Sequence, residues 1–496
     1  MKKTAFLMKT TRVFSTVRKS AWLVTLAVAV GGQFYPPLGL LVPLIMVSLM
    51  GMSLFKGRYW CGNFCPHGSF FDFLLQPISR NKKIPGLLAS KITVVLFFVF
   101  FMFNLTRRFV AAIGNIENIP LYNSVGTIFS TTYLMVLLAG GLLAVIISPR
   151  TWCQFCPMGS IQTLLYKLGK AAGLTAGRDK KVTVNHQLLC HSCGKCARVC
   201  PMQLEPYREF TVSNNQFNDE KCIRCLTCIK NCPVKILSLA NAAEAGTLIK
   251  EADLEGFQDS DQYRGEIVGV KELKKNIREF TIKLLDSKSM ILTPGQFVLV
   301  EVDGDRGLYR AYTVSSAGRD GTEIGITVKR LENGYGSNLL FEKFNEGAIL
   351  KMKGPMGKEL LIDGKRDKLL FVANGIGITP FAYATKYLLE DNNSGKFAGE
   401  ITLLYGVRHE EDLIYDDLFS GLTTNHPNLH YYKALSRADS SNTRRGYVTD
   451  ILKELEIDPL TTVYICGTKG MADRTMEILS EKGIPKYSVH YENLSA

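Results

Sequence analysis

The chain has 496 residues, a net charge of +14 and thirteen cysteines. At roughly 100–200 residues per domain, this length predicts about three or four domains. Twelve of the cysteines fall into four groups with two- or three-residue gaps, which is typical of metal or cluster ligands and not of a secreted disulfide framework. Much of the positive charge flanks apolar segments near the N-terminus, which favours a membrane protein over a nucleic-acid-binding protein.

Long apolar segments dominate the first 150 residues. Residues 21–55 contain no charged side chain and are too long for one membrane span of about 20 residues. Gly31-Gly32 and Pro36-Pro37 interrupt this run, so we expect two spans there. A signal peptide is the alternative for the first run, but the apolar sequence continues beyond any plausible cleavage site. The expected spans, within an α-helical membrane domain at 1–175, are 21–35, 37–55, 87–105 and 130–148.

Lysine and arginine are distributed unevenly around these spans. Residues 1–20 contain six of them and no acid, and residues 56–91 contain six against the single Asp72. Residues 107–127 contain two against Glu117. The positive-inside rule therefore predicts a multi-pass protein of the inner membrane with both termini in the cytoplasm. We expect the lipid bilayer as a partner, and no nucleic acid.

One cysteine motif occurs twice beside apolar segments. Residues 58–69 read RYWCGNFCPHGS and residues 150–160 read RTWCQFCPMGS. Four thiolates brought together could bind a third Fe–S cluster, and a zinc site and a redox-active dithiol are the alternatives. We expect Trp60 and Trp152 to be interfacial anchors and His67 to be a polar residue at the membrane surface. The four cysteines are Cys61, Cys65, Cys153 and Cys156.

Eight further cysteines form two copies of the pattern C-x2-C-x2-C-x3-C-P between residues 180 and 240. Three thiolates of one such loop can hold three corners of a [4Fe–4S] cluster, and the fourth ligand comes from the other loop. A zinc ribbon would need only one set of four cysteines and no following proline. We expect an α+β ferredoxin domain with two clusters. One set of ligands is Cys190, Cys193, Cys196 and Cys232, and the other is Cys222, Cys225, Cys228 and Cys200.

The pattern changes twice after a predicted linker at 241–262. Residues 263–362 contain six short alternating segments separated by turns, which favour an antiparallel β-barrel. These lie at 265–273, 278–285, 296–302, 308–316, 323–330 and 349–355. Residues 363–496 alternate apolar strands with helices and predict a parallel, Rossmann-like α/β domain. Its strands are expected near 369–373, 401–407, 430–435 and 463–466.

Motifs at the ends of these strands suit flavin and dinucleotide binding. An aromatic side chain on a strand, Tyr312, can lie against an isoalloxazine ring, and Arg310 beside it can neutralise pyrophosphate. Glycines at a helix start let the backbone approach phosphate. Ser436 and Arg437 could hold a 2′-phosphate together with Arg444 and Arg445, or form an ordinary solvated loop. The candidate cofactor-binding residues are Arg310, Tyr312, Thr313, Lys329, Gly336, Ser337, Gly375, Gly377, Thr379, Pro380, Ser436, Arg437, Cys466 and Gly467.

Residues 263–496 resemble the ferredoxin–NADP reductase family. The resemblance rests on Arg310-x-Tyr312-Thr313, Gly336-Ser337, Gly375-x-Gly377-x-Thr379-Pro380 and Cys466-Gly467. It implies that the Arg and Tyr bind FAD, that the Gly-x-Gly-x-Thr-Pro loop binds NAD(P)H, and that Tyr312 and Cys466 act at the flavin and the nicotinamide. Three departures stand out. Thr313 replaces the commonest serine and leaves FMN open, Asn374 replaces a frequent glycine, and the C-terminal Glu492-Asn493-Leu494 lacks the aromatic that often covers the flavin.

Residues 1–240 resemble the membrane polyferredoxins of the NapH/NosR type, through two cysteine–proline motifs after membrane spans and a ferredoxin tail. A nicotinamide gives up two electrons as hydride and an Fe–S cluster accepts one at a time, so a flavin must connect them. The order of motifs predicts a membrane-bound NAD(P)H oxidoreductase that passes electrons through FAD and the clusters to a quinone or a partner redox protein. Reverse flow to NAD(P)+ from ferredoxin or quinol, and a redox-sensing or maturation role, are the alternatives. NADH and NADPH both stay open.

Overall fold

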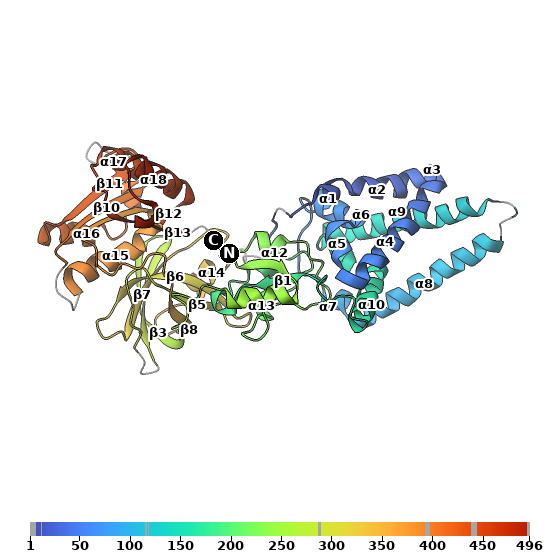
Figure 1. Ribbon diagram of the computed structural model, residues 1–496, viewed down its shortest axis with the longest axis horizontal. Helices are drawn as coiled ribbons and strands as arrows, with labels where there is room; N and C mark the ends of the chain where they lie inside the picture. Colours follow the sequence, from blue (N-terminus) through green and yellow to red (C-terminus); the bar gives the residue numbers. More distant parts are fainter. Residues whose placement is uncertain are drawn as a thin grey trace. The chain divides into compact units, whose positions relative to one another are not determined.

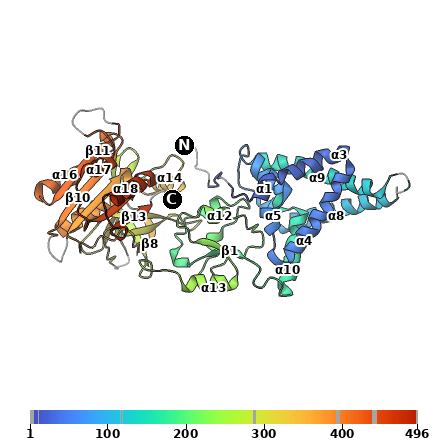
Figure 2. The same cartoon turned by 45° about the horizontal axis from the view of Figure 1, so that its top comes forward.

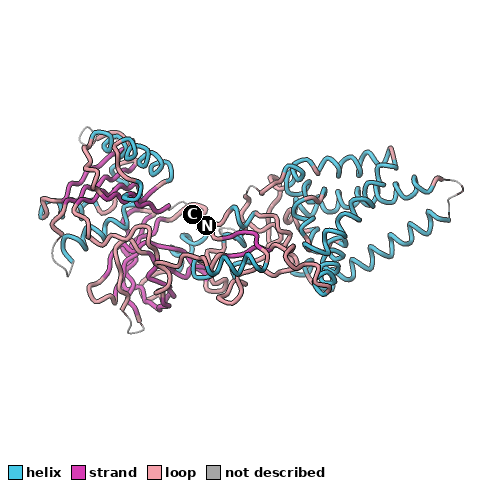
Figure 3. Tube along the Cα trace, in the orientation of Figure 1, coloured by secondary structure: helices cyan, strands magenta, loops and turns pink. Residues whose placement is uncertain are grey.

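The structure, a computed structural model, describes residues 6–10, 12–114, 117, 119–285, 289–391, 397–437 and 444–493. The chain forms two compact units. The N-terminal unit comprises Ala5–Cys190 and Gly194–Ala252, and the C-terminal unit comprises Asp253–Ala496 with the short segment His191–Cys193. Long helices belong to the first half of the chain, and most strands belong to the second (Figure 1, Figure 3).

Three helices among the described residues are long and apolar enough to cross a membrane. The first, Pro36–Lys56, joins the 3-10 turn η2 (Pro36–Leu40) to α4 (Leu41–Lys56). The others are α8 (Lys91–Gly114) and α9 (Leu121–Ile146). Large apolar side chains along α8 are exposed, as contact with lipid requires.

Four spans were expected, and the first is not a single long helix. Residues 16–34 form an interrupted helical stretch, in which each piece is far shorter than a span. Its pieces are α1 (Thr16–Ser20), α2 (Trp22–Leu26), the π-turn η1 (Ala27–Gly31) and α3 (Gly32–Phe34). Tyr35 leaves the helical region with φ −130° and ψ 84°, as residues before proline tend to do.

The third and fourth expected spans are displaced rather than absent. The helix α8 continues through Arg107 and Arg108, and α9 begins at Leu121. The helix α8 therefore begins after residue 87 and continues past 105, and α9 begins before residue 130 and ends before 148. Apolar composition marks only part of each helix, whereas the backbone hydrogen bonds continue for another turn or more at one end.

Small residues bring the apolar helices together. A Cβ atom at Gly39 would overlap the carbonyl of Gly126, and one at Gly126 would overlap the carbonyl of Pro36. The helix α10 (Pro157–Ala171) approaches α4 in the same way, because Gly169 lies against the carbonyl of Leu54. Such close backbone contact is typical of helix packing in membranes.

The ferredoxin region repeats one backbone geometry. The strands β1 (Lys181–Val184) and β2 (Leu237–Ala240) pair antiparallel, and the short helices α11 (Lys195–Arg198) and α12 (Thr227–Lys230) occupy equivalent places in the two cysteine loops. Non-glycine residues rarely take a positive φ, so its recurrence at matched positions indicates that both loops hold the same imposed shape. The matched pairs with positive φ are Ser192 and Arg224, Gly194 and Leu226, and Gln203 and Lys235.

The segment expected to be a linker, 241–262, is partly helical. It contains α13 (Ala242–Lys250), which begins with a reciprocal capping box between Asn241 and Glu244. The alanine and glutamate content that suggested a linker also suits a short helix once a cap is present.

Six antiparallel strands close a barrel in the order β3-β4-β7-β6-β5-β8. All six expected strands are present, with boundaries shifted by a few residues, and α14 (Tyr335–Lys343) follows β7. Ile267, Phe280, Ile282 and Val298 are among the buried side chains of these strands. The strands are β3 (Asp261–Lys274), β4 (Ile277–Leu284), β5 (Phe297–Asp303), β6 (Leu308–Ala317), β7 (Glu323–Lys329) and β8 (Ile349–Met356).

A five-stranded parallel sheet completes the C-terminal unit, in the order β11-β10-β9-β12-β13. Figure 2 labels β10, β11 and β13 of this sheet. Alternate residues of β9 belong to separate apolar clusters, so both faces are covered. One cluster includes Phe381 of α15 (Thr379–Lys386) and Phe419 of α16 (Asp416–Asn425). The other includes Ile451 of α17 (Val448–Glu454) and Ile478 of α18 (Lys469–Glu481).

The strand order of this sheet reverses between β9 and β12. Loops at the carboxyl ends of such a pair border a crevice where dinucleotides bind. Four strands match the expected ones, and β13 was not expected because its sequence is short and polar. The strands are β9 (Lys368–Asn374), β10 (Glu400–Val407), β11 (Leu429–Leu435), β12 (Thr462–Gly467) and β13 (Val489–Asn493).

Candidate functional site

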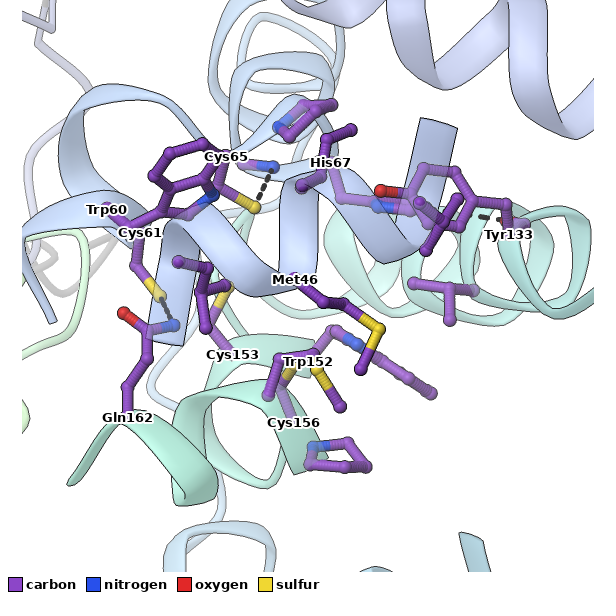
Figure 4. Close-up of a pocket in the computed structure, with 18 of the residues that line it drawn as sticks. Met46, Trp60, Cys61, Cys65, His67, Tyr133, Trp152, Cys153, Cys156 and Gln162 are labelled. Atoms are coloured by element: carbon purple, nitrogen blue, oxygen red, sulfur yellow. Dashed lines mark hydrogen bonds between the residues drawn. The ribbon is translucent and has the colours of Figure 1, made fainter. Parts of the chain in front are cut away.

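The four cysteines of the repeated motif line one cavity of about 120 Å³ in the N-terminal unit (Figure 4). In each motif the second cysteine directly precedes a helix, and the proline after it is the first residue of that helix. Proline is favoured at the first helical position. Cys65 precedes α6 (Pro66–Phe70), and Cys156 precedes α10. Two segments distant in sequence therefore present their thiols to one space.

The sulfur atoms of three of these cysteines accept hydrogen bonds. Gln162 Nε2 donates to Cys61 at 3.1 Å, the backbone N–H of Gly68 donates to Cys65 at 3.3 Å, and Arg150 Nη1 donates to Cys153 at 3.6 Å. Donors directed at sulfur stabilise the thiolate form that metals and clusters require.

The buried thiols are poorly suited to dithiol chemistry. Burial raises the pKa of the Cys65 thiol to about 12 and that of the Cys156 thiol to about 11. An isolated thiol with such a pKa stays protonated at neutral pH and is a weak nucleophile.

Apolar side chains from the long helices form the rest of the cavity wall, including Met46 of α4 and Val136 of α9. Trp152 also lines the cavity and is buried, so it is not an interfacial anchor, and Trp60 lines the cavity as well. His67 was expected at the membrane surface, but its half-buried ring lines the same space and lies 4.3 Å from the ring of Tyr133. Burial lowers the pKa of His67 to about 4, so the ring is neutral.

Two buried arginines flank the four cysteines. Arg150 donates to Asp72 Oδ2 from Nε at 3.0 Å and from Nη2 at 2.7 Å, and Arg18 also pairs with this carboxylate. Burial alone would raise the pKa of Asp72, but Arg150 and Arg18 outweigh it and hold the pKa well below its usual range. Arg58, the first residue of the other motif, donates from Nη2 to the carbonyl of Cys153 at 2.9 Å.

The cysteine cavity adjoins the second ferredoxin loop within the N-terminal unit. Cys61 and Cys153 pack against Cys225, Ile223 and Met202 in one buried cluster. Gly62 lies so close to the loop that an added Cβ would overlap the carbonyl of Ile223. A redox group held by this loop would therefore be a near neighbour of one held in the cavity.

The ferredoxin cysteines are divided between the units. Cys200, from the first motif, packs against the group of buried side chains that includes Cys225 of the second motif. The exchange of fourth ligands between the motifs requires this proximity. Cys222 and Cys228 are in the same unit, as are Cys190, Cys196 and Cys232. Cys193 belongs to the segment that joins the C-terminal unit.

The expected flavin residues lie together on the barrel. Arg310, Tyr312 and Thr313 are half-buried residues of β6, while Lys329 ends β7 and is exposed. The Arg310 side chain crosses the start of α14, because a Cβ at Gly336 would lie 2.9 Å from its Cγ and Nε atoms. The Ser337 hydroxyl accepts the backbone N–H of Leu331 at 3.1 Å and fixes the turn that leads into α14. These positions fit a flavin with its pyrophosphate at Arg310 and the helix start.

The expected dinucleotide residues meet at the switch point of the sheet. Gly375 follows β9 with φ 55°, and Thr379 and Pro380 open α15. A Cβ at Gly377 would overlap the carbonyl of Cys466, so only glycine lets the two loops come this close. Cys466 itself is fully buried at the end of β12, next to Gly467.

The basic loop after β11 is only partly available to a nucleotide phosphate. Arg444 forms a bidentate ion pair with Glu454. Ser436 and Arg437 are held through their backbone N–H groups, which donate to the carbonyls of Val407 and Arg408, and Arg437 is exposed. Arg445 is exposed as well.

Two residues of this region were noted from sequence only as departures from the family pattern, and the structure shows how each is held. Asn374, noted only as a departure from glycine, ties the two loops together by bonding the backbone N–H of Thr468 at 2.9 Å and its hydroxyl at 3.0 Å. Glu492 of β13 lies opposite Cys466 of β12 in the strand register. Burial raises the pKa of the Glu492 carboxyl group to about 7. Leu494, part of the third departure, lies outside the described residues.

Four known domain families match successive parts of the chain. A 4Fe-4S binding domain matches residues 38–85 and 131–175, and a 4Fe-4S dicluster domain matches 181–233. An oxidoreductase FAD-binding domain matches 264–359, and an oxidoreductase NAD-binding domain matches 371–477. Among characterised proteins, ferredoxin–NADP reductase B of Sorangium cellulosum is 32% identical over 243 residues, covering 47% of this chain and 98% of that protein. The chain belongs to the ferredoxin–NADP reductase family.

In this chain the reductase domains follow a polyferredoxin region of the NapH/NosR type. The chain is an oxidoreductase that uses FAD, NAD(P)H and [4Fe–4S] clusters. The toluate 1,2-dioxygenase electron transfer component of Pseudomonas putida is 28% identical over 235 residues, covering 47% of this chain and 68% of that protein. A solved ferredoxin NADP+ reductase of Neisseria gonorrhoeae matches with a TM-score of 0.40 at 21% identity, over 47% of this chain and 98% of that chain.

Proposed function

We propose that this reductase is bound to the membrane and passes electrons from NAD(P)H, through FAD and the [4Fe–4S] clusters, to a quinone or a partner redox protein. One observation carries the proposal. Cys61 and Cys153 pack directly against the Cys225 loop, in a cavity whose other walls are apolar membrane helices. The repeated motif thus lies where the ferredoxin region meets the membrane region.

The eight ferredoxin cysteines would hold two clusters, with Cys200 and Cys232 each serving the loop of the other motif. Cys61, Cys65, Cys153 and Cys156 would hold a third. Support for the third comes from the donors directed at three of the sulfur atoms and from the two flanking arginines. A thiolate-bound cluster is an anion, and buried anions need such partners.

Bound FAD supplies the exchange between hydride and single electrons. In the proposed site Tyr312 would contact the flavin ring, and Arg310 with Gly336-Ser337 would hold its phosphates. The Gly375–Pro380 loop would hold the nucleotide, with Cys466 on the nicotinamide side of the site. Asn374 fixes the distance between the two loops through Thr468. No general acid or nucleophile is needed, because positioning carries the chemistry.

Both termini and both cysteine motifs are proposed to lie on the cytoplasmic side. Met8 donates its backbone N–H to Arg198, and Arg12 donates to the carbonyl of Val199 at 2.6 Å, so the N-terminal arm lies on the ferredoxin loop. The helix α4 ends next to the first cysteine motif. The interrupted helical stretch 16–34 would therefore make the first of four crossings, despite its short pieces.

The test is anaerobic EPR of the full chain in detergent, with iron and flavin quantified, before and after addition of NADH or NADPH. We expect about twelve iron atoms per chain, four for each of three clusters, and clusters that the nucleotide reduces. A content of about eight iron atoms would show that the four-cysteine cavity holds no [4Fe–4S] cluster. Clusters that stay oxidised would contradict the proposed direction of electron flow.

A further inference from the structure

The two copies of the cysteine motif brace each other through their first residues. Arg58 Nη2 donates to the carbonyl of Cys153 at 2.9 Å, and Arg150 Nη1 donates to the carbonyl of Cys61 at 3.2 Å. Each arginine thus bonds the first cysteine of the other copy. The exchange explains why an arginine stands three residues before that cysteine in both copies.

The glycines of the two motifs make room for this exchange. A Cβ at Gly159 would lie 2.7 Å from Arg58 Nη2, and a Cβ at Gly68 would overlap Arg150 Nη1. Each Cys-Pro-x-Gly sequence therefore accommodates the arginine of the opposite copy. The geometry of the two halves is nearly equivalent.

Their electrostatics are not equivalent. Arg150 is fully buried and paired with Asp72, which is also fully buried in its side chain. Arg58 is 4% exposed and forms no ion pair with a carboxylate in the described parts of the chain, and its Nε atom has no hydrogen-bond partner. Arg58 lines the cavity that holds the four cysteines, whereas the carboxylate of Asp72 is directed to Arg150 and Arg18.

The buried charges around the cavity leave a positive excess. Arg12, Arg18, Arg58 and Arg150 contribute four positive charges and Asp72 one negative charge, which leaves three positive charges. Guanidinium groups do not lose their proton in proteins, so an anion must compensate them. An oxidised [4Fe–4S] core with four thiolates is a dianion and would offset two of these positive charges.

We propose that Arg58, which lines the cavity and has no carboxylate partner in the described residues, raises the reduction potential of the cluster held by Cys61, Cys65, Cys153 and Cys156, while Asp72 offsets the equivalent charge of Arg150. This inference rests on the proposed function, which places a cluster in the cavity. Reduction adds one negative charge to the cluster. A positive charge at its edge in a low-dielectric site favours the reduced form, and a carboxylate opposes it. Arg58 and Asp72 therefore shift the potential in opposite directions.

The test is a redox titration of the full chain in detergent, followed by EPR, on wild type, Arg58→Gln, Arg58→Lys and Asp72→Asn. The signal that disappears in Cys65→Ala identifies the cluster of the cavity. We expect the midpoint potential to fall in Arg58→Gln, to stay near wild type in Arg58→Lys, and to rise in Asp72→Asn. Lys167→Gln removes an exposed positive charge from α10 and should leave the potential unchanged.

A purely structural role for Arg58 predicts shifts of the same sign in Arg58→Gln and Asp72→Asn, or no shift, and either result overturns the inference. If Arg58→Gln loses the iron of this site, the inference is tested by Asp72→Asn alone. Only the charge argument predicts that the midpoint potential of the cluster rises in that variant. A wild-type iron content of about eight atoms would overturn the proposed cluster and this inference together. A content of about twelve with an unchanged potential in Arg58→Gln would overturn the inference alone.

Discussion

Replacing Glu492 with glutamine should remove a pH-dependent loss of stability from the C-terminal unit. Glu492 lies opposite Cys466 in the register of β12 and β13, and its Oε2 atom is buried without a hydrogen-bond partner. Burial raises its pKa from 4.5 to about 7, and Glu359 adds to the shift. The difference of about 2.5 units, at about 1.4 kcal/mol per unit, corresponds to about 3 kcal/mol.

The direction of the effect follows from proton binding. Below pH 4.5 the Glu492 carboxyl group is protonated in both the folded and the unfolded chain, so it does not lower the free energy of unfolding. Between pH 4.5 and about 7 the unfolded chain releases the proton and the folded chain retains it, so the free energy of unfolding falls as pH rises. Above about pH 7 the loss is complete. Glu492→Gln should therefore be more stable than wild type by up to about 3 kcal/mol above neutrality and equal to it in acid.

The assay is urea unfolding of both proteins at several pH values, followed by flavin fluorescence, with the difference in unfolding free energy plotted against pH. In this difference, the contributions of all groups that titrate equally in the two proteins cancel. Glu359→Gln serves as a control, because loss of the neighbouring carboxylate should move the transition of wild-type Glu492 to lower pH without abolishing it. A difference that does not vary with pH would refute the reasoning.

Three further predictions concern the electron path and the nucleotide. Cys225→Ala should leave flavin reduction by NAD(P)H intact and abolish quinone reduction, measured by stopped-flow absorbance and steady-state turnover; unchanged quinone reduction would exclude a linear path. Gly62→Ala should slow quinone reduction but not flavin reduction, because the added Cβ overlaps the backbone of Ile223, whereas Gly246→Ala, which meets no neighbour, should change neither rate. Arg437→Ala should raise KM for NADPH and not for NADH if this exposed side chain holds a 2′-phosphate; an equal change in both KM values would assign it to the loop alone.

The sequence predicted the C-terminal unit more accurately than the membrane region. Alternating strands leave a strong period in the sequence, so all six barrel strands and four sheet strands appeared near their true positions. The membrane region has no such period. The stretch expected to be the first span is interrupted by a π-turn and by Tyr35, and apolar composition alone does not report such breaks.

The predictions for the aromatic residues that line the cavity differ from the structure for one physical reason. Trp60, Trp152 and His67 were assigned to the membrane surface because they adjoin apolar segments, but tertiary packing turns them toward the four cysteines. The partners that decide this, on α4 and α9, are remote in sequence. The roles of Arg58 and Arg150 were hidden for the same reason, since each acts on the other copy of the motif.

Both repeats of the N-terminal unit follow the same principle of exchange. In the ferredoxin region Cys200 of one motif packs against the group of buried side chains that includes Cys225 of the other motif. In the membrane region the arginine of each motif bonds the first cysteine of the other. A centre built in this way forms only when both halves are folded, because neither half supplies a full set of ligands and charges. The small difference between the halves is then the place where function can be adjusted, and Asp72 is such a difference: it neutralises one arginine and leaves Arg58 facing the cavity.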